Sequence, residues 1–237
     1  MIIAGIVAGG AGSRMGNTKL PKQFLDLCGK PVIVRTTEKF ISVSQIDIVI
    51  IGINPEWKNY MTKLKDKYFK NVKKLIITDG GKDRNATVQN IISTAEKSGA
   101  DDESIVLTHD AVRPFVTEKM ISDSVNAMKS CDICTVAIPA TDTVVSSESG
   151  VSISGFPLRK TMFQEQTPQT FKLGTFKNVC ENIDKEQLEN VTDVCRLFYM
   201  CGYDVKLIQG DVSNIKLTFP YDYTVAKILV ENKKIKI

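Results

Sequence analysis

The chain has 237 residues, of which 43% are hydrophobic and 24% are charged. These proportions are typical of a globular protein with a sizeable core, and they argue against intrinsic disorder. The 31 Lys and Arg residues exceed the 27 Asp and Glu residues to give a net charge of +4, too weak a balance for a nucleic-acid-binding domain. The longest apolar stretch, residues 46–53, is far shorter than the ~20 residues of a membrane span.

The N-terminal stretch and the cysteines indicate a cytoplasmic protein. The apolar residues 1–8 have no basic region ahead of them, so we do not expect a signal peptide. Six cysteines are scattered along a chain too long to need disulfides, and we expect them to be reduced thiols. Cys131 and Cys134 form a C-x-x-C pair without a second such pair, and His109 is the only histidine, so we expect no zinc site.

Strand-like and helix-like segments alternate along the chain. Apolar or β-branched runs predict strands at 2–8, 46–53, 75–78, 105–108, 133–138, 205–208 and 215–219. Apolar residues at helical spacing, together with caps and first-turn prolines, predict helices at 31–41, 55–68, 88–95, 117–128, 173–183 and 192–201. A closing helix is expected from Pro220, with Val225, Ile228 and Leu229 facing inward. This alternation favours an α/β fold with a mostly parallel sheet flanked by helices.

Residues 141–160 interrupt the alternation. The segment is polar, rich in Ser, Thr and Val, and contains Gly150 and Gly155. This composition predicts a protruding β-hairpin arm rather than a helix. A solitary polar arm would leave strand edges exposed, and such edges invite pairing, so we expect a homodimer formed through the arm.

A glycine-rich segment at residues 8–16 follows the first predicted strand. Exposed backbone N–H groups in such a loop form a nest for anions, although a plain tight turn is an alternative interpretation. The dinucleotide fingerprint fails because Met15 stands at the third glycine position, and the Walker A pattern fails because Asn17 follows Gly16. Arg14 lies in the loop and Lys22 follows it, and this pairing of cations suits a polyphosphate.

A second candidate site is the run His109-Asp110-Ala111-Val112-Arg113-Pro114-Phe115. It stands at the carboxyl end of a predicted strand, where open α/β sheets bind their ligands. Asp110 there is a natural Mg²⁺ ligand, because Mg²⁺ takes one or two carboxylates and completes its shell with phosphates and water. The alternative is a local ion pair between Asp110 and Arg113 that shapes the turn. We expect His109 to be a packed structural residue.

The segment 80–87, Gly-Gly-Lys-Asp-Arg-Asn-Ala-Thr, is also glycine-rich and also follows a predicted strand. Its backbone groups and the Thr87 hydroxyl could hold a nucleobase or a ribose. Taken alone, the segment fits a structural turn equally well.

The ordered motifs together resemble a known family. They are A-G-G-x-G-S-R-M, L-P-K-Q-F, G-G-x-D-R, H-D-A-V-R-P-F, Q-T-P-Q-x-F and N-I-K-x-T. Their order, from Ile3 to about Val230, resembles the cytidylyltransferases that activate polyol phosphates. The resemblance implies a Rossmann-like nucleotidyltransferase fold in a single domain, residues 1–237, with 141–160 as its dimerisation arm.

Two branches of these enzymes are close to the chain. One makes CDP-ribitol for teichoic acids, and the other makes CDP-methylerythritol for isoprenoid synthesis. The L-P-K-Q-F motif, Val112, Phe115 and the lead-in Gln164-Glu165-Gln166 look more like the ribitol branch. The methylerythritol branch usually has Ala in place of Val112 and often an acidic residue in place of Lys82, so we carry no base contact onto the Lys82 side chain.

The resemblance implies roles for individual residues. The residues implied to line the CTP pocket are Ala8, Gly9, Gly10, Gly12, Gly81, Thr87 and Arg113, the last supporting the metal ligand. Arg14, Lys22 and Lys216 are implied to act in catalysis, and Asp110 is implied to bind Mg²⁺. The implied acceptor contacts are Thr143 and Arg159 from the arm of the partner subunit, with Thr192 and Lys216 from the home subunit.

The chemistry suits these residues. The second pKa of a phosphate monoester is about 6, so the acceptor is largely a dianion at neutral pH and needs no general base. Catalysis then requires alignment and neutralisation of charge. We therefore expect transfer of CMP from CTP to D-ribitol 5-phosphate, giving CDP-ribitol and pyrophosphate for teichoic acid or a related polymer. A separate reductase partner could supply the polyol phosphate, since the chain contains no reductase-like segment.

Three alternatives differ from this prediction. The nearest is the same transfer to 2-C-methyl-D-erythritol 4-phosphate. A nicotinamide dehydrogenase is disfavoured by Met15, and a non-catalytic nucleotide-binding regulator is disfavoured by the presence of Arg14, Lys22, Asp110 and Lys216.

Overall fold

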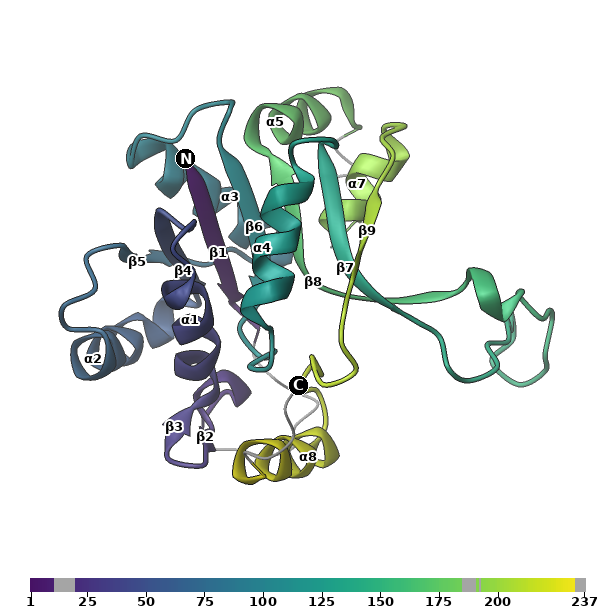
Figure 1. Ribbon diagram of the computed structural model, residues 1–237, viewed down its shortest axis with the longest axis horizontal. Helices are drawn as coiled ribbons and strands as arrows, with labels where there is room; N and C mark the ends of the chain where they lie inside the picture. Colours follow the sequence, from purple (N-terminus) through teal and green to yellow (C-terminus); the bar gives the residue numbers. More distant parts are fainter. Residues whose placement is uncertain (11–19, 185–190, 192, 233–237) are drawn as a thin grey trace.

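A seven-stranded sheet forms the centre of the computed structural model, which describes residues 1–10, 20–184, 191 and 193–232 (Figure 1). The sheet consists of β1 (Ile2–Ala8), β4 (Ile48–Ile53), β5 (Leu75–Asp79), β6 (Ile105–Asp110), β7 (Ile133–Pro139), β8 (Phe163–Lys172) and β9 (Lys206–Gln209). Its order is β5-β4-β1-β6-β8-β7-β9. All neighbouring strands are parallel except β8, which runs antiparallel to β6 and β7.

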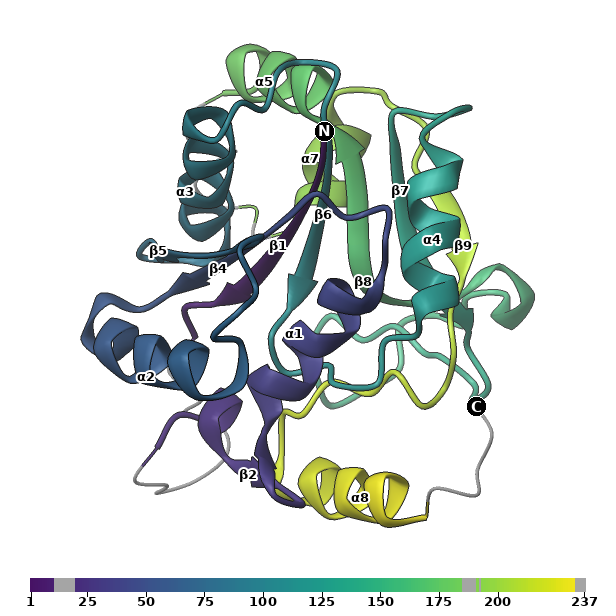
Figure 2. The same ribbon diagram turned by 60° about the vertical axis from the view of Figure 1, so that its left-hand side comes forward.

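Helices cover both faces of the sheet (Figure 2). One face carries α1 (Val32–Ser42), α2 (Lys58–Tyr68) and α4 (Glu118–Ala127), and the other carries α3 (Arg84–Lys97), α5 (Leu173–Asn182) and α7 (Val194–Met200). Short elements are η2 (Lys22–Phe24), β2 (Asp26–Leu27), β3 (Lys30–Pro31), η3 (Pro55–Trp57) and η4 (Arg159–Thr161), and α8 (Pro220–Glu231) closes the described chain. The predicted α/β fold with a mostly parallel sheet is confirmed.

Each face of the sheet has its own apolar core. Phe40 of α1 and Ile121 of α4 are fully buried on one face, and Ile91 of α3 and Phe198 of α7 are fully buried on the other. The central strands are therefore buried on both sides, which explains the nearly continuous β-branched run of β4. This packing fixes the carboxyl ends of β1, β4, β5 and β6 at one edge of the molecule.

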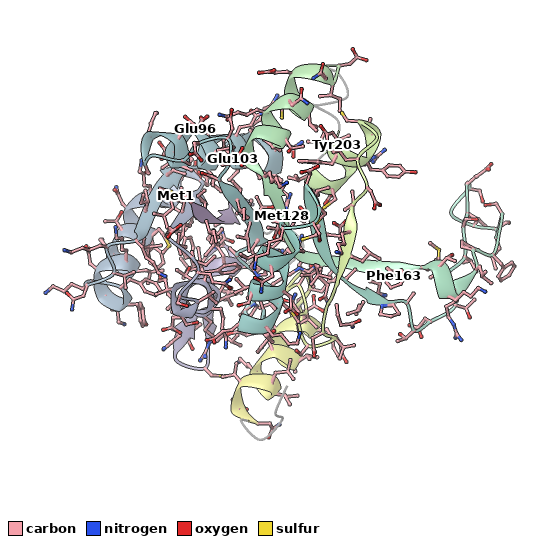
Figure 3. All side chains as sticks on the ribbon, turned by 45° about the horizontal axis from the view of Figure 1, so that its top comes forward. Met1, Glu96, Glu103, Met128, Phe163 and Tyr203 are labelled. Carbon is pink, nitrogen blue, oxygen red and sulfur yellow. The ribbon has the colours of Figure 1, made fainter. Side chains whose placement is uncertain are left out.

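The segment between β7 and β8 projects from the body as an arm (Figure 1). Phe163 marks the place where the returning chain rejoins the sheet (Figure 3). The arm pairs with itself through a single bridge, Ser146 to Gly155, and ends in the turn η4. The predicted protrusion is thus present, although most of it is irregular loop rather than a regular hairpin.

Three expectations about elements need correction. The described segment 215–219 was expected to be a strand, but it forms no ladder, and Leu217 makes one backbone bond to Val112 at 2.9 Å. In α8, Ile228 is 50% exposed and Ala226 is fully buried, because the helix packs on the β2–β3 ribbon rather than on the sheet. The strand β8 was not predicted, because its sequence is mostly polar and so lacks the apolar pattern of a strand inside a sheet.

None of the helices in the described part of the chain combines the length and the apolar character needed to cross a bilayer.

Candidate active site

A cavity of about 780 Å³ lies at the carboxyl ends of β1, β4, β5 and β6. Its lining residues are Val7, Ala8, Gly9, Gly10, Lys22, Gln23, Asn54, Pro55, Gly80, Gly81, Lys82, Asp83, Arg84, Thr87, Asp110, Ala111, Val112 and Lys216. The structure thus brings together residues from five separate motifs. This is the position at which parallel α/β sheets bind ligands.

The L-P-K-Q-F motif is built into the cavity wall by its glutamine. Gln23 is buried, and its amide donates hydrogen bonds to the carbonyls of Ala8 at 2.9 Å and Gly10 at 3.3 Å. The same short helix, η2, buries Phe24 in the core and places Lys22 on the cavity wall. The end of β1 and the predicted phosphate-binding lysine are therefore held in one unit.

The loop into α3 is held together by Thr87. Its buried hydroxyl donates to the carbonyl of Asp83 at 2.8 Å and accepts from the N–H of Gly81 at 3.0 Å. Asp83 caps the helix by accepting from the N–H of Ala86 at 2.8 Å. A Cβ on Gly81 would lie 2.2 Å from the Cβ of Ala86, so only glycine fits there. Thr87 lines the cavity, as expected, but its hydroxyl proton is donated to the Asp83 carbonyl rather than left for a ligand.

Asp110 lies at the centre of a cluster of cations. Its carboxylate is 2.8 Å from the Nζ of Lys216, 3.6 Å from the Nε of Arg84 and 3.7 Å from the Nε of Arg113. Burial alone would raise the pKa of Asp110, but Arg84, Lys216 and Arg113 hold that pKa well below its usual range. Because three cations surround one carboxylate, this wall keeps a net positive charge that suits an anionic ligand.

His109 is buried next to this cluster and fixes the backbone around it. The Thr167 hydroxyl donates to its Nδ1 at 2.8 Å, and its Nε2 donates to the carbonyl of Arg113 at 3.1 Å. Thr167 also accepts from the N–H of Asp110. Burial lowers the pKa of His109 to about 4, so the ring is neutral at neutral pH. The expected structural role of His109 agrees with its full burial.

A second cavity, of about 200 Å³, adjoins the first. It is lined by Arg84, Asp110, Arg113, Glu165, Gln166, Thr167, Gln169, Asp193 and Lys216. Arg84, Asp110 and Lys216 line both cavities, so the cation cluster forms the wall between them. Two ligands, one in each cavity, would therefore lie next to one another at this wall.

Arg84 is a cavity residue that was not predicted from the sequence. Its Nη2 donates to the Oε1 of Gln169 at 2.8 Å, while its Nη1 is buried without a hydrogen-bond partner. An unpaired, buried guanidinium N–H beside a cavity is costly unless a ligand oxygen accepts from it. The available signal was its place in G-G-x-D-R, one residue after the cap of a helix that begins at a strand end.

The predicted acceptor residues of the arm do not reach either cavity in their own chain. Thr143 and Arg159 are exposed, and Arg159 donates to the carbonyl of Thr141 at 3.3 Å. Neither residue lines a described cavity. Gly12, Arg14 and Thr192, which were also predicted to act in the site, lie outside the described residues.

Asp110 is also the predicted metal ligand. Mg²⁺ binds one or two carboxylates and takes its remaining oxygens from phosphates and water. A single ionised carboxylate on the cavity wall fits this requirement, provided that a triphosphate supplies further oxygens. The surrounding cations oppose a metal bound alone, so the donor set fits a metal that arrives with its nucleotide.

The family model for IspD, 2-C-methyl-D-erythritol 4-phosphate cytidylyltransferase, matches residues 2–232. The chain belongs to this family. It is a cytidylyltransferase, and thus a nucleotidyltransferase enzyme, as the motifs predicted.

Solved structures of similar proteins agree with this assignment. A 4-diphosphocytidyl-2C-methyl-D-erythritol synthase from Anaerococcus prevotii superposes with a TM-score of 0.80 at 26% identity, over 97% of this chain and 96% of the other. A second structure described as such a synthase gives 0.79 at 28% identity, over 97% of both chains. The 2-C-methyl-D-erythritol 4-phosphate cytidylyltransferase of Francisella tularensis gives 0.78 at 25%, over 96% and 98%.

Proposed function

We propose that this enzyme transfers CMP from CTP to D-ribitol 5-phosphate. An oxygen of the acceptor phosphate forms a bond to the α-phosphorus of CTP, the bond from that phosphorus to the bridging β-oxygen breaks, and pyrophosphate leaves with the electron pair. The products are CDP-ribitol and pyrophosphate. The first cavity would hold CTP and the second the acceptor, with the Asp110 cluster between them.

The polarity of the second cavity carries the choice of acceptor. All nine residues that line it have polar or charged side chains. Ribitol 5-phosphate presents a hydroxyl on each carbon beyond its phosphate and no methyl group. The branch methyl of 2-C-methyl-D-erythritol 4-phosphate would gain little in such a cavity, because apolar groups gain from apolar neighbours. Glu165 and Gln166 of this lining belong to the lead-in that resembles the ribitol branch.

Transfer to 2-C-methyl-D-erythritol 4-phosphate is the second candidate. The comparisons support it more directly than they support ribitol phosphate, since the family description and the similar structures all carry that acceptor or its product in their names. The identity to these structures is 25–28%, a level at which acceptors within one family can differ.

The residues of the wall perform the transfer by opposing charge repulsion. The acceptor is already a dianion near neutral pH, so no base is needed. Lys22 would bind the triphosphate, and Lys216, Arg113 and Arg84 would hold the transferring phosphoryl group and the acceptor phosphate in line. Asp110 would hold Mg²⁺, which neutralises charge on the triphosphate when bound.

The arm supports a further part of this proposal. Because Thr143 and Arg159 stand away from the body of their own chain, they can complete an acceptor site only in a second copy. We therefore propose a homodimer of single nucleotidyltransferase domains in which each arm reaches the second cavity of its partner. The exposed apolar side chains of the arm, Val151, Phe156 and Leu158, support burial against a partner.

Pyrophosphate release tests the proposal. The enzyme is incubated with CTP, Mg²⁺ and either ribitol 5-phosphate or 2-C-methyl-D-erythritol 4-phosphate. We expect release with CTP and ribitol 5-phosphate, and kcat/KM at least tenfold lower with the second acceptor. Turnover confined to 2-C-methyl-D-erythritol 4-phosphate would replace the first candidate by the second.

A further inference from the structure

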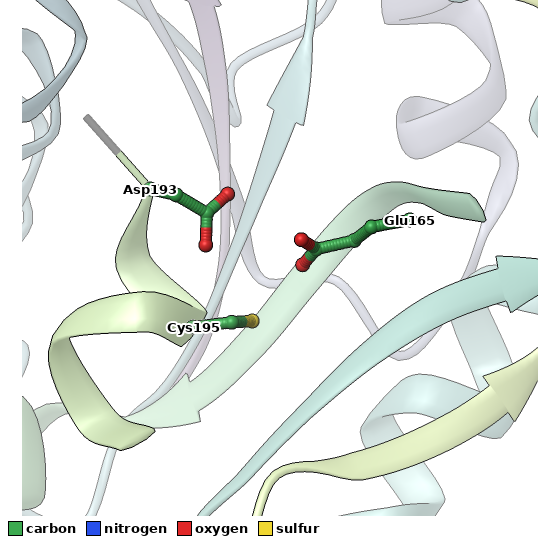
Figure 4. Close-up of side chains that lie close together, drawn as sticks. All are labelled: Glu165, Asp193 and Cys195. Atoms are coloured by element: carbon green, nitrogen blue, oxygen red, sulfur yellow. The ribbon is translucent and has the colours of Figure 1, made fainter. Parts of the chain in front are cut away.

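Two carboxylates in the lining of the second cavity face one another. Glu165 belongs to β8, and Asp193 caps α7 by accepting from the N–H of Arg196 at 3.0 Å (Figure 4). Together with the Sγ of Cys195, they offer three ligating atoms that all lie within 4.8 Å of one another. The transfer of CMP itself requires neither carboxylate.

Gln169 fixes both carboxylates in place. Its amide nitrogen donates to the Oε1 of Glu165 at 2.8 Å and to the Oδ2 of Asp193 at 2.6 Å. Its amide oxygen accepts from the Nη2 of Arg84 at 2.8 Å, which sets the orientation of the amide. Gln169 is itself 1% exposed, so this bridge is rigid. A continuous chain of contacts thus runs from Asp110 through Arg84 and Gln169 to the two acids.

The cluster is a poor metal centre. Burial raises the pKa of the Cys195 thiol strongly, and Glu165 and Asp193 raise it further, so the sulfur stays protonated. The two carboxylates already share the amide protons of Gln169, and the Thr135 hydroxyl donates to Glu165 at 2.8 Å. These neutral donors hold the acids in place without a cation, and each carboxylate keeps further lone pairs that can accept hydrogen bonds.

The second cavity is therefore lined by groups of opposite charge. Arg84, Arg113 and Lys216 surround Asp110. Glu165 and Asp193 also line the cavity, and the Gln169 amide joins them to Arg84. A ligand that is anionic at one end and rich in O–H donors at the other matches both, because carboxylates accept strong hydrogen bonds from hydroxyls. A phosphorylated linear polyol has this form.

We propose that Glu165 and Asp193 select the acceptor by accepting hydrogen bonds from the polyol hydroxyls that lie farthest from its phosphate. This inference rests on the proposed function and adds the residues that read the polyol. The phosphate is held by the cations around Asp110, and the length of the polyol decides whether its last hydroxyls reach the acids. Short polyol phosphates forgo these bonds.

Two near-isosteric variants test the inference, Glu165→Gln and Asp193→Asn. Asparagine still caps a helix, so α7 keeps its cap. We expect KM for ribitol 5-phosphate to rise about tenfold in each variant, since a charged acceptor makes a stronger bond than an amide. KM for CTP should stay within twofold, and so should kcat/KM measured with glycerol 3-phosphate, which lacks the distal hydroxyls. Glu103→Gln, at the opposite end of β6, is the matched control.

The readout is the ratio of kcat/KM for ribitol 5-phosphate to that for glycerol 3-phosphate. A general loss of folding lowers both values and leaves the ratio unchanged, whereas the inference predicts a ratio about tenfold smaller. An unchanged ratio in both folded variants would overturn it. So would a stoichiometric divalent metal in the purified enzyme that disappears in Glu165→Gln. Absence of wild-type turnover with any polyol phosphate would instead remove the proposed function on which the inference rests.

Discussion

The side chains of this site fall into two groups, those that are available to bind a ligand and those that hold the surrounding structure in place. Lys216 and Arg113 contact Asp110 and line the second cavity. The side chains of Gln23 and His109 instead form hydrogen bonds within the protein. Asp110 was predicted from its place at a strand end, Lys22 from its place after the glycine-rich segment, and Lys216 only from the family resemblance. All three line the first cavity. Arg84 and Glu165 were not predicted, because a charged residue in a polar stretch looks like a solvated surface group until the fold brings it to a cavity.

Arg84 gives the sharpest prediction at the scale of a residue. Arg84→Gln should lower kcat about 100-fold, because it removes the unpaired Nη1 from the wall between the cavities, an effect comparable to losing one oxyanion donor. Arg84→Lys should recover only part of the rate, since lysine keeps the charge but loses the planar fork. Arg196→Gln, an exposed position on α7, is the control. Steady-state kinetics with kcat near the wild-type value in Arg84→Gln would refute this role.

Elements differ in how far the sequence predicts them. The buried parallel strands were predictable because apolar residues fill both of their faces. The strand β8 escaped prediction because Gln166, Thr167 and Gln169 are buried polar residues whose hydrogen bonds come from the site around them. Likewise, the segment 215–219 has the apolar alternation of a strand, but it joins no sheet and contacts Val112 through Leu217.

The loop into α3 yields a prediction at the scale of an element. Thr87→Val keeps the shape of the side chain but leaves the Asp83 carbonyl and the Gly81 N–H without the hydroxyl. The free energy of unfolding should fall by roughly 1–3 kcal/mol, and KM for CTP should rise. Thr87→Ser keeps the hydroxyl and is the matched control. Equal urea midpoints for the two variants would show that the hydroxyl does not stabilise the loop.

The arm yields a second prediction of this kind. If each arm completes the acceptor site of its partner, then an Arg159→Ala variant and a Lys216→Ala variant are each nearly inactive. Mixed in equal amounts and allowed to exchange subunits, they should recover up to about one quarter of wild-type activity, because half of the dimers are mixed and each mixed dimer has one intact site. No recovery in a mixture that light scattering shows to have exchanged would contradict a shared site.

At the scale of the whole molecule, the topology of the sheet explains where the positive charge is concentrated. The net charge of +4 says little, because the cations that matter are gathered where the parallel strands end and β8 crosses between β6 and β7. One sheet therefore places two adjoining cavities on either side of one acidic residue, Asp110. The family and its chemistry follow from this arrangement together with the match to residues 2–232.

The most direct test of the account is a competition between the two acceptors. The enzyme is given CTP, Mg²⁺ and equal concentrations of ribitol 5-phosphate and 2-C-methyl-D-erythritol 4-phosphate, and the CDP-linked products are separated and counted at early times. The ratio of products equals the ratio of the two kcat/KM values. The account predicts CDP-ribitol in at least tenfold excess. A product mixture dominated by CDP-methylerythritol would contradict it.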